Sequence, residues 1–363
     1  MITYVFAFIS VWYFLNIVWL IYGFNQVKTF EYKNVSPITK FSIIVPFRNE
    51  EEDLPKLLQS ISLLNYPSLF FEVILVDDDS DFRFQVSGFR FQISIIDNIR
   101  ASKSPKKDAI STAISIAKND WIITTDADCL VSENWLSTFD AFIQENNPKM
   151  IAAGVSYHSG SSFLDAFQTL DFLSLQGTTI GSFGNEQAFM CNGANFCYQK
   201  KFFKDLNGFI GNENIASGDD VFLLQKAIAT DKKNVHFLNS AAAIVETKTE
   251  SNWKILFNQR VRWASKTNNY SSFYSKQLAI SVFLLNLICV IIYMSLLVYP
   301  HFLAILLLLL KFTLDYILLA QTALFFKKKL SYIFFSSLFY PIFCVCVAVY
   351  SIFGKYTWKN RQF

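Results

Sequence analysis

Two aspartates one residue apart, Asp126 and Asp128, follow a short apolar run that ends at Ile123. Aspartate is uncommon in strands and costly to bury without a partner, so the end of this run needs an explanation. A surface turn would explain it, because Asp is common in turns. Carboxylates are also what Mg²⁺ and Mn²⁺ use in proteins when substrate phosphates supply further ligands. The pair therefore indicates either a polar strand end or a cation site that serves a phosphorylated ligand.

A second pair of acids, Asp219 and Asp220, stands just before an apolar helical run in the stretch SGDDVFLLQKA. Considered singly, either residue is explained as an N-cap with a favourable acid beside it. Whether the pair belongs to a site therefore depends on the rest of the chain.

The stretch NWKILFNQRVRWASK, residues 252–266, predicts an amphipathic helix. Its apolar face would carry Trp253, Leu256, Phe257, Val261 and Ala264. Gln259, Arg262 and Trp263 gather on the opposite face. A helix of this kind ahead of an apolar span is typical of the membrane interface. That interpretation leaves the grouping of a Gln, an Arg and a Trp unexplained.

Strands and helices alternate between residues 41 and 128, which predicts an α/β fold with a mostly parallel sheet covered by helices. Strands are expected at 41–47, 71–77, 91–97 and 121–126, and helices within 50–64 and 104–120. Asn49 with Glu52 predicts a capping box for the first helix, with acids in its first turn. Three of the four strands end at Asp, namely Asp77, Asp97 and Asp126. Ligands of such sheets bind at the carboxyl ends of the strands, so these acids are candidate site residues.

Long apolar segments predict an integral membrane protein. Hydrophobic residues make up 52% of the chain, with 39 phenylalanines. Residues 2–24, 277–310 and 331–353 contain no Lys, Arg, Asp or Glu. Each is long enough to cross a bilayer, and the first reads as an anchor because it lacks a basic start and a small-residue cleavage site. Lys311 and Asp315 interrupt an apolar span one helical turn apart, where they can bond to each other.

Basic residues predict the orientation in the membrane, which we expect to be the bacterial inner membrane. Lysines follow the first span, so the positive-inside rule places residues 25–276 in the cytoplasm. Residues 327–329, all Lys, would also be cytoplasmic after two crossings between 277 and 326. A third crossing at 331–353 would place the basic tail outside. The last apolar segment, which Pro341 interrupts, is therefore either a span or a re-entrant or interfacial segment.

Several function classes are excluded or disfavoured. A formal charge of +3 without a basic stripe gives no reason to expect a nucleic-acid partner. There is no Gly-x-Gly-x-x-Gly and no P-loop, which disfavours dinucleotide enzymes and P-loop NTPases. The six cysteines show no Cys-x-x-Cys spacing, so they are expected to be free thiols rather than a zinc site, although Cys191 and Cys197 could pair.

Four stretches in this order, VDDDS, DAD, GDD and QRVRW, resemble family 2 glycosyltransferases over residues 38–270. More narrowly, the chain resembles the membrane-bound inverting branch that includes ceramide glucosyltransferase and the cellulose, chitin and hyaluronan synthases. It departs from the family pattern at Asp219, where Glu is usual, and at Pro105, where Gly commonly precedes the lysine.

The resemblance implies a GT-A domain that uses a nucleotide-diphospho-sugar, usually a UDP-sugar, with Mg²⁺ or Mn²⁺ and a membrane lipid or glycan acceptor. Asp220 would be the catalytic base with Asp219 beside it, and Asp128 would bind the cation. Gln259 and Arg262 would hold the pyrophosphate, and Trp263 would border the acceptor. The residues implied for nucleotide-sugar binding are Pro46, Arg48, Glu50, Asp77, Asp78, Lys106 and Asp126. One direct displacement assisted by one base would invert the anomeric centre.

The expected domains are an anchor (1–25), a cytoplasmic GT-A domain (26–246), an interfacial segment (247–276), two or three C-terminal spans (277–354) and a basic tail (355–363). Three alternatives stay open. The chain could be a processive polysaccharide synthase, although its spans offer little wall for a channel. It could transfer to a polyprenyl phosphate, or it could be an inactive membrane subunit that binds nucleotide-sugar.

Overall fold

The computed structural model describes residues 2–215, 217–353, 357–358 and 361–362, and they form two compact units. We call Lys28–His158 with Met190–Lys248 the sheet unit. The helical unit comprises the described residues of Met1–Val27, Ser159–Phe189 and Thr249–Phe363. Residues 159–189 fall within the expected 26–246 domain in sequence, but they group with the long helices. The expected boundaries themselves stay a prediction.

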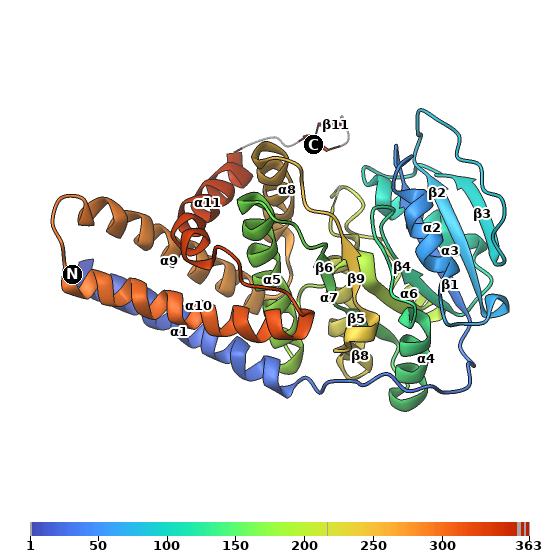
Figure 1. Ribbon diagram of the computed structural model, residues 1–363, viewed down its shortest axis with the longest axis horizontal. Helices are drawn as coiled ribbons and strands as arrows, with labels where there is room; N and C mark the ends of the chain where they lie inside the picture. Colours follow the sequence, from blue (N-terminus) through green and yellow to red (C-terminus); the bar gives the residue numbers. More distant parts are fainter. Residues whose placement is uncertain (1, 216, 354–356, 359–360, 363) are drawn as a thin grey trace. The chain divides into compact units, whose positions relative to one another are not determined.

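The sheet unit contains a seven-stranded sheet in the order β3-β2-β1-β4-β7-β5-β8 (Figure 1). Its strands are β1 (Phe41–Phe47), β2 (Phe71–Asp77), β3 (Gln92–Asp97), β4 (Trp121–Thr124), β5 (Met150–Ala153), β7 (Phe196–Gln199) and β8 (Val235–Leu238). Strand β7 is antiparallel to both of its neighbours, and the other pairings are parallel. The predicted mostly parallel α/β sheet is therefore confirmed.

The register of this sheet aligns the carboxyl ends of its first strands. Asp77 pairs with Phe47 on one side and with Asp97 on the other. Thr124, the last residue of β4, pairs with Ile44. Asp126 and Asp128 therefore emerge at the same edge as Asp77, as expected for acids that follow parallel strands.

Helices and short turns complete the sheet unit. The helices are α2 (Leu54–Ser62), α3 (Pro105–Ile116), α4 (Trp135–Asn146), α6 (Lys200–Asp205) and α7 (Asp219–Asp231). The 3₁₀ turns are η1 (Ser68–Phe70), η2 (Gly193–Asn195), η3 (Lys232–Asn234) and η4 (Ala241–Ala243). Helix α3 packs on β1 and β2. A small parallel pair, β6 (Val155–Tyr157) with β9 (Val245–Thr247), lies beside the segment after β4 through the antiparallel bridge between Leu130 and Glu246.

The capping box predicted from Asn49 and Glu52 is wrong. Helix α2 begins later, at Leu54, with Asp53 as N-cap, no capping bond from its side chain and no acid in the first turn. Pro55 sets the start, because proline is tolerated only in the first turn of a helix. Asn49 instead has a left-handed backbone (φ 53°) and donates from its amide Nδ2 to Asp81 at 2.8 Å.

The helical unit contains α1 (Ile2–Gln26), α5 (Phe163–Gly184), α8 (Trp253–Ser265), η5 (Thr267–Asn269), α9 (Phe273–Leu296), α10 (Phe302–Phe326), α11 (Ile333–Phe353) and the strand pair β10 (Thr357–Trp358) and β11 (Arg361–Gln362). In the described part of the chain, four segments are long and apolar enough to cross a membrane: Tyr4–Gln26, Phe273–Leu296, Phe302–Phe326 and Ile333–Ile352. The last apolar segment thus forms a long helix in spite of Pro341. Most of the basic tail, 355–363, lies outside the described residues.

Helix α5 packs against α1, α10 and α11, and glycines allow its closest approach (Figure 1). A Cβ on Gly181 would lie 2.4 Å from the Leu20 carbonyl oxygen, and one on Gly184 would lie 1.8 Å from the Gly23 carbonyl oxygen. Real Cβ atoms do not come so near, so only glycine fits at this crossing. This helix is not among the elements predicted from the sequence.

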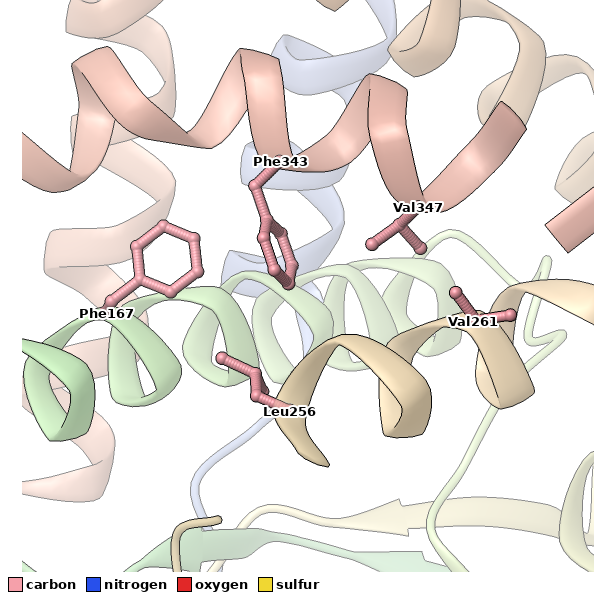
Figure 2. Packing of buried hydrophobic residues seen from close by; sticks show 5 residues of the cluster. All are labelled: Phe167, Leu256, Val261, Phe343 and Val347. Carbon is pink, nitrogen blue, oxygen red and sulfur yellow. The ribbon is translucent and has the colours of Figure 1, made fainter. Parts of the chain in front are cut away.

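The apolar face of α8 forms the core of a cluster with α5 and α11. Figure 2 shows Leu256 and Val261 of α8 facing Phe167 of α5 and Phe343 and Val347 of α11. Phe257 and Ala264 pack at its margin. The amphipathic helix predicted for residues 252–266 is therefore confirmed, and its apolar side is packed against protein.

Two further expectations concern single side chains. Lys311 Nζ lies 2.8 Å from Asp315 Oδ2, as predicted, and the Tyr13 hydroxyl donates to the other oxygen of Asp315 at 2.7 Å. All six cysteines are free, so the open pairing of Cys191 with Cys197 does not occur.

Candidate active site

Lys106, the second residue of α3, bonds to an acid at the end of β4. Its Nζ lies 2.6 Å from Asp126 Oδ1 and 3.6 Å from Asp219 Oδ2. Burial alone would lower the pKa of this ammonium, but the carboxylates of Asp126, Asp219 and Asp220 outweigh burial and raise the pKa well above its ordinary value. Lys106 is therefore a permanent positive charge among three acids. The structure brings together four residues that the sequence analysis had named from separate stretches.

Asp219 and Asp220 are the first two residues of α7, and neither is its N-cap. The N-cap is Gly218, whose left-handed backbone (φ 82°) suits glycine. Asp220 accepts hydrogen bonds from the backbone N–H of Val221 at 2.7 Å and of Gly193 at 2.9 Å. The N-cap explanation of these acids is therefore wrong, although both profit from the positive end of the helix.

Gly193 in η2 brings backbone close to this cluster. A Cβ at this position would lie 3.0 Å from Asp219 Oδ2 and 3.4 Å from Lys106 Nζ. The Gly193 carbonyl accepts from Thr124 Oγ1 at 2.6 Å, which fixes η2 to β4. A side chain here would crowd the ammonium and the acids, so we add Gly193 to the site.

Lys248 lies beside Asp128, a neighbour that the sequence analysis missed. The antiparallel bridge between Leu130 and Glu246 brings their two segments together, and the Asp128 carboxylate interacts electrostatically with Lys248. Lys248 Nζ bonds to Asp53 Oδ2, and Lys56 Nζ lies 3.2 Å from the other oxygen of Asp53. Burial would lower the pKa of Lys248, but the bond to Asp53, with smaller contributions from Asp128 and Glu50, raises it. No motif marks this lysine.

The residues expected to bind the nucleotide base meet at the ends of β1, β2 and β3. Asp77 accepts from the Ser80 backbone N–H at 2.9 Å. Asp78 is buried and accepts from Asn98 Nδ2 at 2.7 Å and from Arg100 at 3.4 Å. Arg48 donates to the Asp78 carbonyl at 2.8 Å, which ties the loop after β1 to the loop after β2.

The remaining two residues of that set lie next to these loops. Pro46 is in β1 and pairs in register with Val76. The Glu50 carbonyl accepts the backbone N–H groups of Asp53 and Leu54 at the start of α2. Both therefore lie at the carboxyl ends of the strands, together with Asp77, Asp78 and Arg48.

Gln259, Arg262 and Trp263 lie on α8 and belong to the helical unit, not to the sheet unit. Gln259 donates from Nε2 to Glu250 Oε1. The Trp263 ring packs near Phe172 of α5, with 6.0 Å between ring centroids. Arg262 is half-buried on the same helix. These residues belong to one cluster within the helical unit, and the acids around Lys106 belong to the sheet unit.

The donor set fits a hard divalent cation. In the residues that the structure describes, no group of three or more His, Cys, Asp and Glu could hold a metal by itself. Asp126 and Asp128 supply carboxylate oxygens. Mg²⁺ and Mn²⁺ need only one or two protein carboxylates where substrate phosphates and water complete the ligand set. The arrangement therefore suits a cation that arrives with a phosphorylated substrate.

Comparisons with known proteins agree with this geometry. Residues 42–206 match the sequence model of glycosyl transferase family 2. The probable glycosyltransferase YdaM of Bacillus subtilis is 24% identical over 268 residues, covering 68% of this chain and 61% of that protein. The poly(ribitol-phosphate) beta-N-acetylglucosaminyltransferase TarS of Staphylococcus aureus is 28% identical over 115 residues, covering 31% of this chain and 20% of that protein. The chain thus spans three fifths and one fifth of these relatives.

Among solved structures, the mannosyltransferase PcManGT from Pyrobaculum calidifontis, in complex with GDP-Man and Mn²⁺, has a similar fold. The alignment covers 97% of this chain and 96% of that one, with a TM-score of 0.62 and 14% identity. The sheet unit therefore has a GT-A-like fold, and residues 42–206 match the family 2 glycosyltransferase domain. The matched family is the expected one, and the narrower membrane-bound branch stays a prediction.

Proposed function

We propose that the protein is an inverting glycosyltransferase that moves a sugar from a nucleotide-diphospho-sugar to a membrane-associated acceptor, by preference a lipid. One observation carries this proposal above the others. In a domain of family 2, one ammonium, Lys106, holds Asp126 and Asp219 at the carboxyl edge of the sheet, with Asp220 beside them. Such a cluster can bind a cation together with a diphosphate. It can also supply a general base, from the N-terminal end of α7.

Asp220 is the base in this proposal. Asp219 lies 3.6 Å from the Lys106 ammonium and is 9% exposed, so it is engaged in holding the cluster. Asp220 is half-buried and is oriented by the N–H groups of Gly193 and Val221. The acceptor hydroxyl gives its proton to Asp220 as its oxygen attacks the anomeric carbon, and the bond from that carbon to the diphosphate oxygen breaks. The anomeric centre inverts in this single displacement.

The donor lies along the ends of β1, β2 and β4 in this proposal. Asp77 or Asp78 contacts the base, and Pro46, Arg48 and Glu50 line that part of the site. Lys106 and Asp126 lie near the ribose. Asp128 holds Mg²⁺ or Mn²⁺, which when bound neutralises charge on the diphosphate.

Lys248 adds a second positive charge to the diphosphate side of the site. The electrostatic interaction of Lys248 with Asp128 supports this role, because the diphosphate would lie beside a cation bound at Asp128. Asp53 would keep a partner if Lys248 turned toward the donor, since Lys56 also bonds to it. The site would then hold the leaving group with one ammonium besides the divalent cation.

Helix α8 contributes residues for both the pyrophosphate and the acceptor in this proposal. Gln259 and Arg262 hold the pyrophosphate, and Trp263 offers a flat face to a sugar ring or lipid. The four candidate spans support an acceptor that resides in the membrane. The sheet unit would face the cytoplasm, with residues 1–25 as anchor, 247–276 at the interface and 277–354 as further spans.

The test is a donor screen on the full-length protein in native lipid extract. UDP-sugars come first because they are usual for the family, and GDP-mannose comes second because PcManGT binds it. We expect release of the nucleoside diphosphate and a lipid product heavier by one sugar in mass spectrometry, with Asp220→Asn as the inactive control. A ladder of products would instead indicate a processive synthase. Donor binding without release or transfer would support an inactive binding subunit and contradict the proposal.

A further inference from the structure

Arg260, inside the QRVRW stretch, has no role in the proposed function, yet its side chain contacts several neighbouring side chains. It is 5% exposed, and its Nε donates to Asp171 Oδ2 of α5 at 2.5 Å. Asp171 is 8% exposed. The hydrogen-bonded ion pair between this buried carboxylate and the buried guanidinium fixes α8 against α5 at this point.

The same guanidinium touches Trp263, assigned to the acceptor, and Gln259, assigned to the pyrophosphate. Its central carbon lies 4.3 Å from the centroid of the Trp263 ring, within the range of a cation–π contact. Its NH1 group donates to Gln259 Oε1. Arg260 therefore joins Asp171 to Gln259 and Trp263. The edge of its planar guanidinium bonds to Asp171 and Gln259, and the face of the same group stacks on the Trp263 ring.

Helix α5 supports Gln259 from a second direction. Gln259 donates to Glu250, and the backbone of Glu250 is held by Gln168, which accepts from its N–H at 2.7 Å and donates to its carbonyl at 3.0 Å. Gln168 is fully buried on α5, one turn before Asp171. Phe172, the residue after Asp171, packs near the Trp263 ring.

We infer that Asp171 and Arg260 are positioning residues, which set the orientation of Trp263 for the acceptor and of Gln259 for the pyrophosphate. The inference rests on the proposed function, because it gives Trp263 its role at the acceptor. Only arginine suits this position: its planar group can bond at its edge while it stacks on an aromatic ring, and a lysine ammonium can do only one of these. An ion pair that served folding alone would not require the stacking.

The experiment compares Arg260→Lys and Asp171→Asn in the full chain reconstituted in lipid. Each is recorded with and without Trp263→Phe, so that the difference spectrum isolates the emission of Trp263 among the seven tryptophans. The matched control is Lys149→Met, which breaks the 2.6 Å pair between Lys149 and Asp231 in the sheet unit. Thermal unfolding, nucleoside diphosphate affinity, donor hydrolysis and sugar transfer are measured for all of them.

Arg260→Lys keeps a charge for Asp171 but loses the stacked plane. We expect a changed Trp263 emission and transfer reduced by about a hundredfold, as for a misplacement of roughly 1 Å. Transfer should fall more than donor hydrolysis does. Lys149→Met should lower stability without changing either the Trp263 emission or the ratio of transfer to hydrolysis.

Two results would overturn the inference. One is a Trp263 emission that stays as in wild type in both variants; the other is an unchanged ratio of transfer to hydrolysis in Arg260→Lys. If Asp171→Asn does not fold, Arg260→Lys decides alone, since it retains the pair. A wild-type protein without transfer to any acceptor would count against the proposed function, whereas the Trp263 emission would still decide the positioning role.

Discussion

The charged clusters of the two units differ in balance. In the sheet unit one ammonium, Lys106, faces the carboxylates of Asp126, Asp219 and Asp220. In the helical unit Arg260 pairs with Asp171, and Lys311 pairs with Asp315. A balanced buried pair needs no further charge, whereas like charges gathered at one site are stabilised by an added cation. The excess of acid therefore favours the proposed cation at this site.

Exposure separates the two kinds of cluster in the same way. The side chains of Lys106 and Asp126 are 23% and 37% exposed, but those of Arg260 and Asp171 are only 5% and 8% exposed. A substrate with its cation can reach the first pair and cannot reach the second. We therefore expect single substitutions in the sheet unit to change the rate of sugar transfer. In the helical unit the effect should depend on whether the ion pair is kept.

The largest effect should come from Asp220→Asn. Loss of a general base typically costs about 10²–10⁴-fold in rate, and the nucleotide affinity should stay near wild type because the base acts in the transition state. Asp219→Asn should have the milder effect on turnover. Initial rates of transfer together with nucleotide Kd values check this. A reversal of the two effects would mean that Asp219 is the base.

The second-largest effect should come from loss of the divalent cation. Removal of divalent cations with EDTA, or Asp128→Asn, should reduce transfer by at least about a hundredfold, as for other lost electrostatic contacts to a leaving group. Nucleoside diphosphate binding, measured by calorimetry with and without Mn²⁺, should depend on the metal only in wild type. Full turnover of wild type in EDTA would remove the cation from the mechanism and leave the unbalanced acids unexplained.

A smaller effect is expected for Lys248→Met. A hydrogen bond to a charged group contributes about 1.5–3 kcal/mol, so nucleoside diphosphate binding should weaken by about tenfold or more. Lys56→Met is the matched control, because Lys56 bonds to the same Asp53, whereas Asp128 acts on Lys248. Equal losses of affinity in both variants would show that Lys248 acts only through Asp53.

The smallest effect should follow the exchange of Lys311→Asp with Asp315→Lys. The exchange keeps a balanced pair one turn apart on α10, so folding and transfer should remain close to wild type. Lys311→Met alone leaves Asp315 uncompensated and should cost about 3–5 kcal/mol of stability, read by thermal unfolding. An exchanged protein that folds and hydrolyses donor but does not glycosylate lipid would assign the pair to the acceptor path.

Most of the sheet and its acids could be predicted from the sequence. Buried strands such as 41–47 and 71–77 are short apolar runs that end at turn residues, and parallel strands bring their carboxyl ends to one edge. Lys106 and Asp126 could be named, but their contact could not, because it depends on how α3 docks on the sheet. The side chain that each acid meets is set by tertiary packing.

The misses have physical reasons too. Helix α5 carries apolar, polar and small residues on all sides because it packs against α1, α8, α10 and α11, so no single stripe reveals it. Its glycines favour turns in a local analysis, yet they serve a close helix crossing. Lys248 was missed because its relation to Asp128 comes from strand pairing across more than a hundred residues. The wrong capping box at Asn49 reflects competition between a local pattern and Pro55.

The position of α5 in the chain also constrains synthesis. Strand β7, residues 196–199, lies between β4 and β5 in the sheet, but the ribosome makes it only after α5. While α5 emerges, the sheet is therefore incomplete. The edges of β4 and β5 that will later pair with β7 are still unpaired. A continuous fragment from residue 28 to 248 would carry α5 without α1 or α10 to cover it. The sheet unit should consequently be difficult to produce alone, and shortening this protein for expression should begin from the helical unit that α5 requires.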